Sequence, residues 1–138
     1  STGATVADTS IYAEPNRGVI TGRDAPMVFQ TYAEVRLLKA EMAFRGWSVP
    51  GDAKTHYEAG VKAAMQMLGS IYPKTAAITD AQVADYLAAK PYDAARGWEM
   101  ISEQYWAATL LNEYESFNNW RSRVHRFAFM RFTCRQRL

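Results

Sequence analysis

Apolar side chains recur at helical spacing in two neighbouring stretches of the chain. In residues 31–45, one apolar set follows intervals of three and four: Tyr32, Val35, Leu38 and Met42. A second set lies on roughly the opposite side of the same stretch: Ala33, Leu37, Ala40 and Phe44. Residues 52–68 have a single apolar face: Tyr57, Val61, Ala64 and Leu68. These patterns predict two amphipathic helices, with Gly46 ending the first, and the short loop between them predicts an antiparallel hairpin.

Two further helices are expected in the second half of the chain. Thr79 followed by Gln82 fits a capping box, in which each side chain binds the backbone amide of the other residue. A short helix is therefore expected over residues 80–89, ending before Pro91. A last helix is expected from residue 93 or 94 to residue 120, with Gly97 as a weak point in its first turn. No stretch has the pattern of a strand, so the predicted fold class is all-α.

The last predicted helix is rich in aromatic side chains. One set falls within an arc of about 120° on a helix: Trp106, Leu110, Tyr114, Phe117 and Trp120. A second set lies on the other side: Trp98, Ile101, Tyr105 and Ala108. Aromatic rings can bind the C–H groups of a sugar, but rings on a helix stripe are far more often buried. We therefore expect both stripes to belong to the core.

The composition is that of one folded domain, with 138 residues of which 49% are hydrophobic and 22% charged. No apolar run is long enough to cross a membrane as a helix, and the single cysteine, Cys134, excludes an internal disulfide. The chain starts with Ser1 and lacks a basic-then-apolar start, so a signal peptide is expected to be absent or removed. Of the two histidines, His56 and His125, neither has a ligand-spaced acid or cysteine nearby, and surface or capping roles are expected.

The basic residues are concentrated at the end of the chain. Residues 1–120 carry 14 acids against 10 Lys and Arg, whereas residues 121–138 carry six Arg and no acid. Arg mixed with phenylalanine can bind anionic lipid or single-stranded nucleic acid. A terminus without a binding role is the preferred interpretation, and no nucleic-acid partner is predicted.

Catalytic chemistry finds little support in the residues. Glu99 and Glu103 lie four apart and could act as an acid and base pair, but a solvated ridge is the preferred interpretation. Cys134 lies beside Arg131 and Arg135, which could lower its thiol pKa in principle, but a residue without a role is the preferred interpretation so near the end of the chain. No nucleophile, base and orienting group converge, so no enzyme activity, catalytic residue, metal site or cofactor is predicted.

Two segments carry long ordered motifs. The first, residues 31–65, has an AE-rich helix, an Arg-Gly-Trp turn and a helix opening Tyr-x-x-Gly: Ala33, Glu34, Ala40, Glu41, Arg45, Gly46, Trp47, Tyr57 and Gly60. The second, residues 101–121, is a run of spaced polar and aromatic positions: Ile101, Gln104, Trp106, Ala107, Asn112, Glu115, Phe117, Trp120 and Arg121. In order and spacing, the two segments resemble signatures of the SusD/RagB family of surface nutrient-binding lipoproteins. The chain departs from the family at Glu113, where the family usually has Gly, and from Ser122 onward.

The resemblance implies tetratricopeptide-like helix hairpins that form a fragment of a larger SusD-like fold, its C-terminal section. We accordingly divide the chain into an irregular connecting segment (1–28), a SusD-like helical section (29–121) and a basic tail without the family pattern (122–138). The implied function is non-enzymatic binding of a glycan or other oligomeric nutrient at the bacterial cell surface. The alternative is a helical-repeat scaffold that binds a protein partner.

The resemblance also implies partners and a location. The partners are a TonB-dependent, SusC-like outer-membrane transporter and the nutrient itself, and the location is the cell outer membrane, with a lipid anchor on the missing N-terminal part. No family binding residue can be carried over onto this chain. We expect ligand contacts at rings exposed in turns, for which the candidates are Trp47 and Tyr72.

Overall fold

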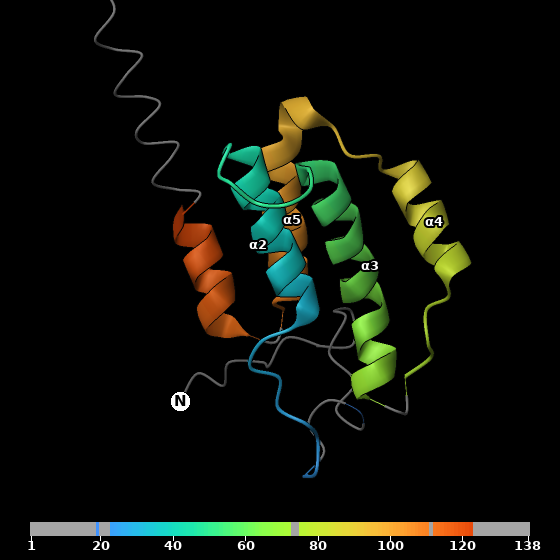
Figure 1. The fold of residues 1–138 in the computed structure, drawn as a ribbon. Coiled ribbons are helices and arrows are strands. Elements are labelled where there is room, and N and C mark those ends of the chain that lie inside the picture. The colour runs from blue at the N-terminus through green and yellow to red at the C-terminus, as the bar shows by residue number, and fades with distance from the viewer. Residues whose placement is uncertain (1–18, 20–22, 73–74, 111, 123–138) are drawn as a thin grey trace, which may run out of the picture.

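The computed structural model describes residues 19, 23–72, 75–110 and 112–122 as a small helical bundle (Figure 1). Its elements are α2 (Tyr32–Phe44), α3 (Ala53–Ile71), α4 (Asp80–Ala89), the 3₁₀ turn η2 (Ala94–Arg96), α5 (Gly97–Ala108) and a helical segment at 113–122. The described residues include no strand, so the all-α prediction is confirmed. Residues 1–18 and the tail beyond residue 122, with His125 and Cys134, lie outside the described part, and the division into three segments stays a prediction.

The ends of the first helices are fixed by side-chain caps. Thr31 accepts a hydrogen bond from the backbone N of Glu34 at 3.1 Å, and the Glu34 carboxylate accepts one from the backbone N of Thr31 at 3.1 Å. At the start of α3, the Asp52 carboxylate accepts a bond from the backbone N of Thr55 at 2.7 Å. The intervening turn holds Gly46 and Gly51 at φ angles of 76° and 93°, which favour glycine. The predicted hairpin is therefore confirmed.

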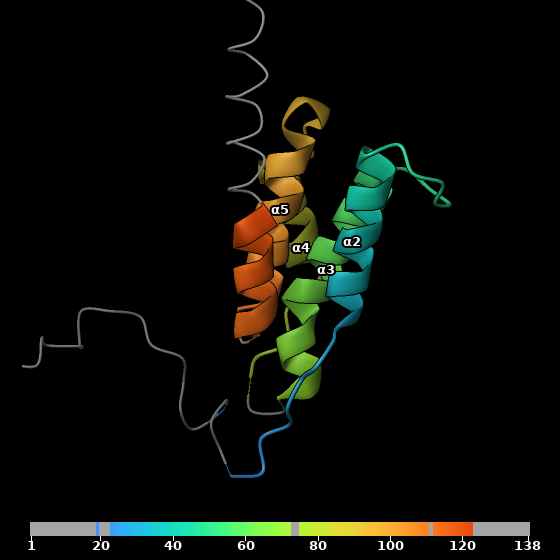
Figure 2. The ribbon, with the colours of Figure 1, turned by 90° about the vertical axis from the view of Figure 1, so that its left-hand side faces the viewer.

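The core lies between the α2–α3 hairpin and α5. Figure 2 shows α5 and helix 113–122 on one side of the hairpin, while α4 contacts α3 on its side away from α2 (Figure 1). Six buried residues from the three central helices form one cluster: Leu37, Ala40, Tyr57, Val61, Ile101 and Tyr105. The hairpin is tight because a Cβ atom on Gly60 would lie 2.7 Å from Cγ of Leu37. The capping box of Thr79 and Gln82 at the start of α4 is also present.

The prediction of one continuous helix to residue 120 is wrong. The helix ends at Ala108, where the Thr109 hydroxyl donates to the backbone O of Tyr105 at 2.8 Å. Hydroxyl side chains of this kind compete with the helical backbone pattern. A new helical segment then begins after Asn112, whose side-chain oxygen accepts a bond from the backbone N of Glu115 at 3.3 Å. Asparagine is a favoured N-cap, and this signal separates two helices where the periodicity indicated one.

Burial confirms one aromatic stripe and contradicts the other. On the confirmed stripe, Ile101 and Tyr105 are buried, and Trp98 and Ala108 are partly buried. The other stripe was expected to be core, but all its members are exposed: Trp106, Leu110, Tyr114, Phe117 and Trp120. The physical reason is that α5 is covered by the hairpin on one side only, and no described element covers its other side (Figure 2).

Gly60→Ala is expected to destabilise the hairpin by about 1–3 kcal/mol, because the added methyl group forces α2 and α3 apart at Leu37. This loss exceeds the gain of roughly 1 kcal/mol that alanine brings inside a helix. Urea unfolding measures the change. In a Leu37→Ala background, the methyl group of Gly60→Ala fills space that the leucine side chain has left, and the substitution should be neutral or stabilising. Equal losses of unfolding free energy in both backgrounds would contradict a close contact of Gly60 with Leu37.

The buried ring of Tyr57 is expected to make stability fall at high pH. Burial raises the pKa of Tyr57 to about 12, so the folded chain keeps this proton where the unfolded chain, with a pKa near 10, has lost it. The contribution is therefore complete below about pH 10 and is lost as the pH rises towards 12, by roughly 2 kcal/mol. Denaturant unfolding between pH 9 and 12 should show a shallower decline for Tyr57→Phe and an unchanged decline for the exposed control Tyr32→Phe.

Candidate functional site

Trp47 lies in the turn between α2 and α3 with 58% of its surface exposed. The guanidinium carbon of Arg45 lies 5.7 Å from the centre of the Trp47 ring and 4.8 Å from that of Trp98, within the range of cation–π attraction. Arg45 also forms an ion pair with Glu41, one turn earlier on α2. The Trp47 ring thus belongs to a cluster in which stacked cationic and aromatic groups tie the hairpin turn to the start of α5.

This cluster, formed by Glu41, Arg45, Trp47 and Trp98, presents chemistry that suits a sugar. A pyranose ring has a face of C–H groups that can lie on an indole, and hydroxyl groups at its edge that can bond to a carboxylate or a guanidinium. The paired charges of Glu41 and Arg45 offer an acceptor and a donor beside the exposed ring of Trp47. Fixed planar groups of this type reduce the entropy lost on binding.

Tyr72 does not share this exposure. It directly follows α3, its ring is 5% exposed, and its hydroxyl donates to the backbone O of Pro26 at 3.3 Å. The expectation of an exposed ring is therefore wrong for Tyr72. Trp47 and Tyr72 also lie beyond opposite ends of α3, whose 19 residues span about 28 Å. The structure does not bring the two candidates together, and a ligand-binding role for either stays a prediction.

The other polar candidates make local contacts. Arg96 donates to the Glu99 carboxylate at 3.0 Å, and Glu103 is exposed one turn later. His56 was expected at the surface or in a cap, but it is 4% exposed with Nε2 2.7 Å from the backbone O of Pro50. The buried His56 ring therefore contacts the backbone of the turn between α2 and α3. Across the described ranges, no group of three or more His, Cys, Asp or Glu side chains is arranged to hold a metal ion.

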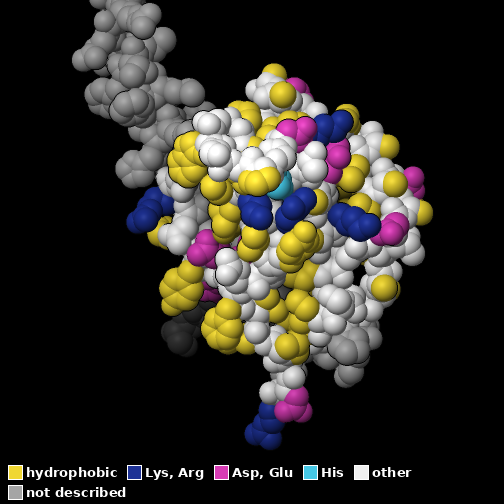
Figure 3. Space-filling model, in the orientation of Figure 1, with side chains coloured by type: hydrophobic (Ala, Val, Ile, Leu, Met, Phe, Trp, Pro, Cys, Tyr) yellow, Lys and Arg dark blue, Asp and Glu magenta, His cyan; other side chains and the backbone are white. Residues whose placement is uncertain are grey.

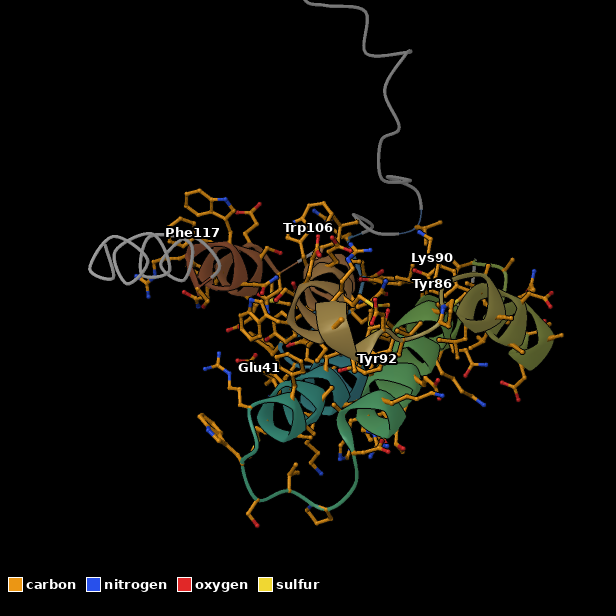
Figure 4. The ribbon with its side chains drawn as sticks, turned by 90° about the horizontal axis from the view of Figure 1, so that it is seen from above. Glu41, Tyr86, Lys90, Tyr92, Trp106 and Phe117 are labelled. Atoms are coloured by element: carbon orange, nitrogen blue, oxygen red, sulfur yellow. The ribbon has the colours of Figure 1, made fainter. Side chains whose placement is uncertain are left out.

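A further exposed feature is an outer aromatic face on α5 and the segment after it. Its members are Trp106, Leu110, Tyr114, Phe117 and Trp120, with exposed fractions between 53% and 85%. Figure 4 shows Trp106 on the side of α5 away from α2 and α3, and Phe117 on the same side of helix 113–122. By contrast, the face that the α2–α3 hairpin presents in Figure 3 mixes hydrophobic, basic and acidic side chains.

Polar side chains attach helix 113–122 to α5. The Tyr105 hydroxyl donates to Glu115 at 2.9 Å, the Ser116 hydroxyl donates to the backbone O of Thr109 at 2.8 Å, and the Asn119 amide donates to the backbone O of Ser102 at 2.9 Å. Burial and the Glu115 carboxylate together raise the pKa of Tyr105. No residue that the structure describes in 113–122 is buried.

Comparison with known proteins identifies the family of this chain. The family model for SusD-like proteins, described as "Starch-binding associating with outer membrane", matches residues 2–129. The chain belongs to the SusD-like family. No curated protein matches it.

Two solved structures are similar to this SusD-like chain. One, titled "chitin-binding protein", shares 37% identity over 70% of this chain, with a TM-score of 0.65. The other, titled "Bacteroidetes AC2a SusD-like", shares 37% identity over 71% of this chain, with a TM-score of 0.64. The matches cover 21% and 19% of those two chains, so the present chain spans about a fifth of their length.

Several residues that carry the SusD-like signature have structural roles here. The Gln104 amide donates to the Tyr86 hydroxyl at 2.9 Å and so joins α5 to α4. Asn112 caps the next helical segment, Glu115 binds Tyr105, and Gly60 permits the tight hairpin. The signature therefore marks the fold. The candidate cluster at Trp47 could be found from sequence only through its exposed position in a turn, while the stacking of Arg45 between two rings required the structure.

Removing the Tyr105 hydroxyl is expected to loosen helix 113–122. Tyr105→Phe deletes the bond to Glu115 and should lower the free energy of unfolding by about 1 kcal/mol, measured by urea denaturation. The matched change Tyr114→Phe removes a hydroxyl from a ring that is 85% exposed and should have no effect. Equal effects of the two changes would contradict a specific role for the Tyr105–Glu115 bond.

Proposed function

We propose that this SusD-like chain is part of a non-enzymatic protein that binds a glycan or other oligomeric nutrient at the bacterial cell surface. In this proposal the protein passes its ligand to a TonB-dependent, SusC-like transporter and is held at the outer membrane by a lipid anchor outside the present chain. The observation that carries the proposal is the family match over residues 2–129 to a model described as starch-binding and outer-membrane-associated. The similarity to a chitin-binding protein at 37% identity supports a glycan ligand.

Within this chain, we assign the ligand contact to the cluster at Trp47. The indole is exposed in a turn, and Arg45 fixes it from one side while the ion pair to Glu41 supplies polar groups at its edge. Tyr72 cannot serve as a stacking surface while its hydroxyl binds Pro26 and its ring is buried.

Among the residues that the structure describes, no helix has the length and apolar character of a membrane span.

The function is tested with the protein that contains this chain. Isothermal titration with chitohexaose and maltohexaose measures glycan binding, and affinity purification from outer membranes tests for a co-purifying TonB-dependent transporter. The proposal expects binding of at least one oligosaccharide and recovery of the transporter. Absence of both would overturn it.

Trp47→Ala is expected to weaken oligosaccharide binding about tenfold, the loss of roughly 1.4 kcal/mol of contact energy. Tyr32→Ala is the matched control, because Tyr32 is also exposed on the hairpin and lies 5.8 Å from the guanidinium carbon of Arg36. The control should leave the affinity unchanged. If the parent protein binds the oligosaccharide and Trp47→Ala binds it equally well, the glycan contact is not at Trp47. That result would contradict the assigned site and would not contradict glycan binding by the protein.

A further inference from the structure

The outer aromatic face leaves several large apolar side chains in water. Four of them are aromatic rings, each more than half exposed, at Trp106, Tyr114, Phe117 and Trp120, and the fifth is Leu110. Soluble proteins rarely expose such a contiguous apolar patch unless something binds to it. The question is what covers it.

The helical segment 113–122 is turned with its polar side inward. The residues that face α5 are Glu115, Ser116 and Asn119, each held by a hydrogen bond to that helix or to its C-terminal cap. The large apolar residues of the segment lie on the other side and are exposed: Tyr114, Phe117 and Trp120. An amphipathic helix directs its apolar stripe towards the core that stabilises it. The core that this segment serves must therefore lie on the side away from the bundle.

The rings of the face are arranged as in a packed core. Phe117 and Trp120 lie against each other, with ring centres 6.0 Å apart and planes inclined at 33°, an arrangement common among packed core rings. Glu115, Ser116 and Asn119 form their hydrogen bonds on the opposite side of the helix.

We infer that the outer aromatic face is one half of a second hydrophobic core, and that the other half is an apolar surface of the remaining SusD-like fold on the same polypeptide. The relative lengths support this occupant, because the matched region makes up only 21% and 19% of the two solved SusD-like structures. The face is formed by two elements, α5 and helix 113–122, as expected for one layer of a larger helical packing. This inference rests on membership of the family and is independent of the ligand.

Hydroxyl-radical footprinting of the longer SusD-like protein tests the inference, because Trp47 and Trp120 are each 58% exposed in the present structure. If other parts of the fold cover the face, Trp120 should be oxidised at least about fivefold more slowly than Trp47, and Trp106 should be protected with it. Rates for Trp120 and Trp47 within twofold of each other would overturn the proposal. Protection of Trp120 that appears only at high protein concentration, or only with added chitohexaose, would also overturn it, in favour of a second copy or a glycan.

A pair of variants gives a second readout in the same protein. Phe117→Asp places a charge in the proposed core and should lower the melting temperature by about 5 °C or more, or prevent folding altogether. Tyr32→Asp introduces the same charge at another exposed ring, 66% against 56%, and should change the melting temperature by less than about 1 °C. Equal melting temperatures for the two variants would overturn the inference.

Discussion

The close approach of α2 and α3 positions the core of the described bundle. Gly60 lets the backbone of α3 meet the side chain of Leu37, and any larger residue would push the helices apart. Only at this separation can α5 lie across the hairpin and bury Ile101 and Tyr105 in a common core. The turn between the two helices is held by its own contacts, among them that of His56 with the backbone O of Pro50, and it carries Trp47 beside Arg45.

The core made in this way is one-sided. Its apolar residues lie between the hairpin and α5. Helix 113–122 is oriented the other way: its hydrogen-bonding side chains face α5, and its aromatic rings are exposed. The chain spans about a fifth of the length of its two solved relatives. This length agrees with a structure in which α5 packs on the hairpin and its outer aromatic face packs on another part of the fold. The proposed glycan contact, at the hairpin turn, lies apart from that outer layer.

The sequence predicted the elements whose signals are local. The hairpin, the capping box at Thr79 and the all-α class followed from periodicity and caps, and the SusD-like family followed from two ordered signatures, which the family match confirms. The prediction of one long last helix was wrong because the apolar period continues without a break across the cap at Asn112. The prediction that both aromatic stripes are buried was wrong because periodicity shows only that a face is apolar. It does not show whether another element covers that face.

The site could be predicted only in part. Exposure of Trp47 followed from its place in a turn, whereas the burial of Tyr72 depends on a contact with Pro26, 46 residues earlier in the chain. Contacts between distant segments of this kind leave no local pattern. The same limit applies to the contact of Arg45 with Trp98, which lies 53 residues later in the chain.

The α2–α3 hairpin and α5 form the stable unit of the described structure, and hydrogen bonds of Glu115, Ser116 and Asn119 attach helix 113–122 to it. Hydrogen exchange of the 138-residue chain distinguishes the two parts, because amides in the core open only with global unfolding and weakly held segments open locally. We expect the slowest exchange around Leu37, Val61 and Ile101, and exchange at least about a hundredfold faster across 113–122. Equal protection of 113–122 and α5 would contradict this division of the structure.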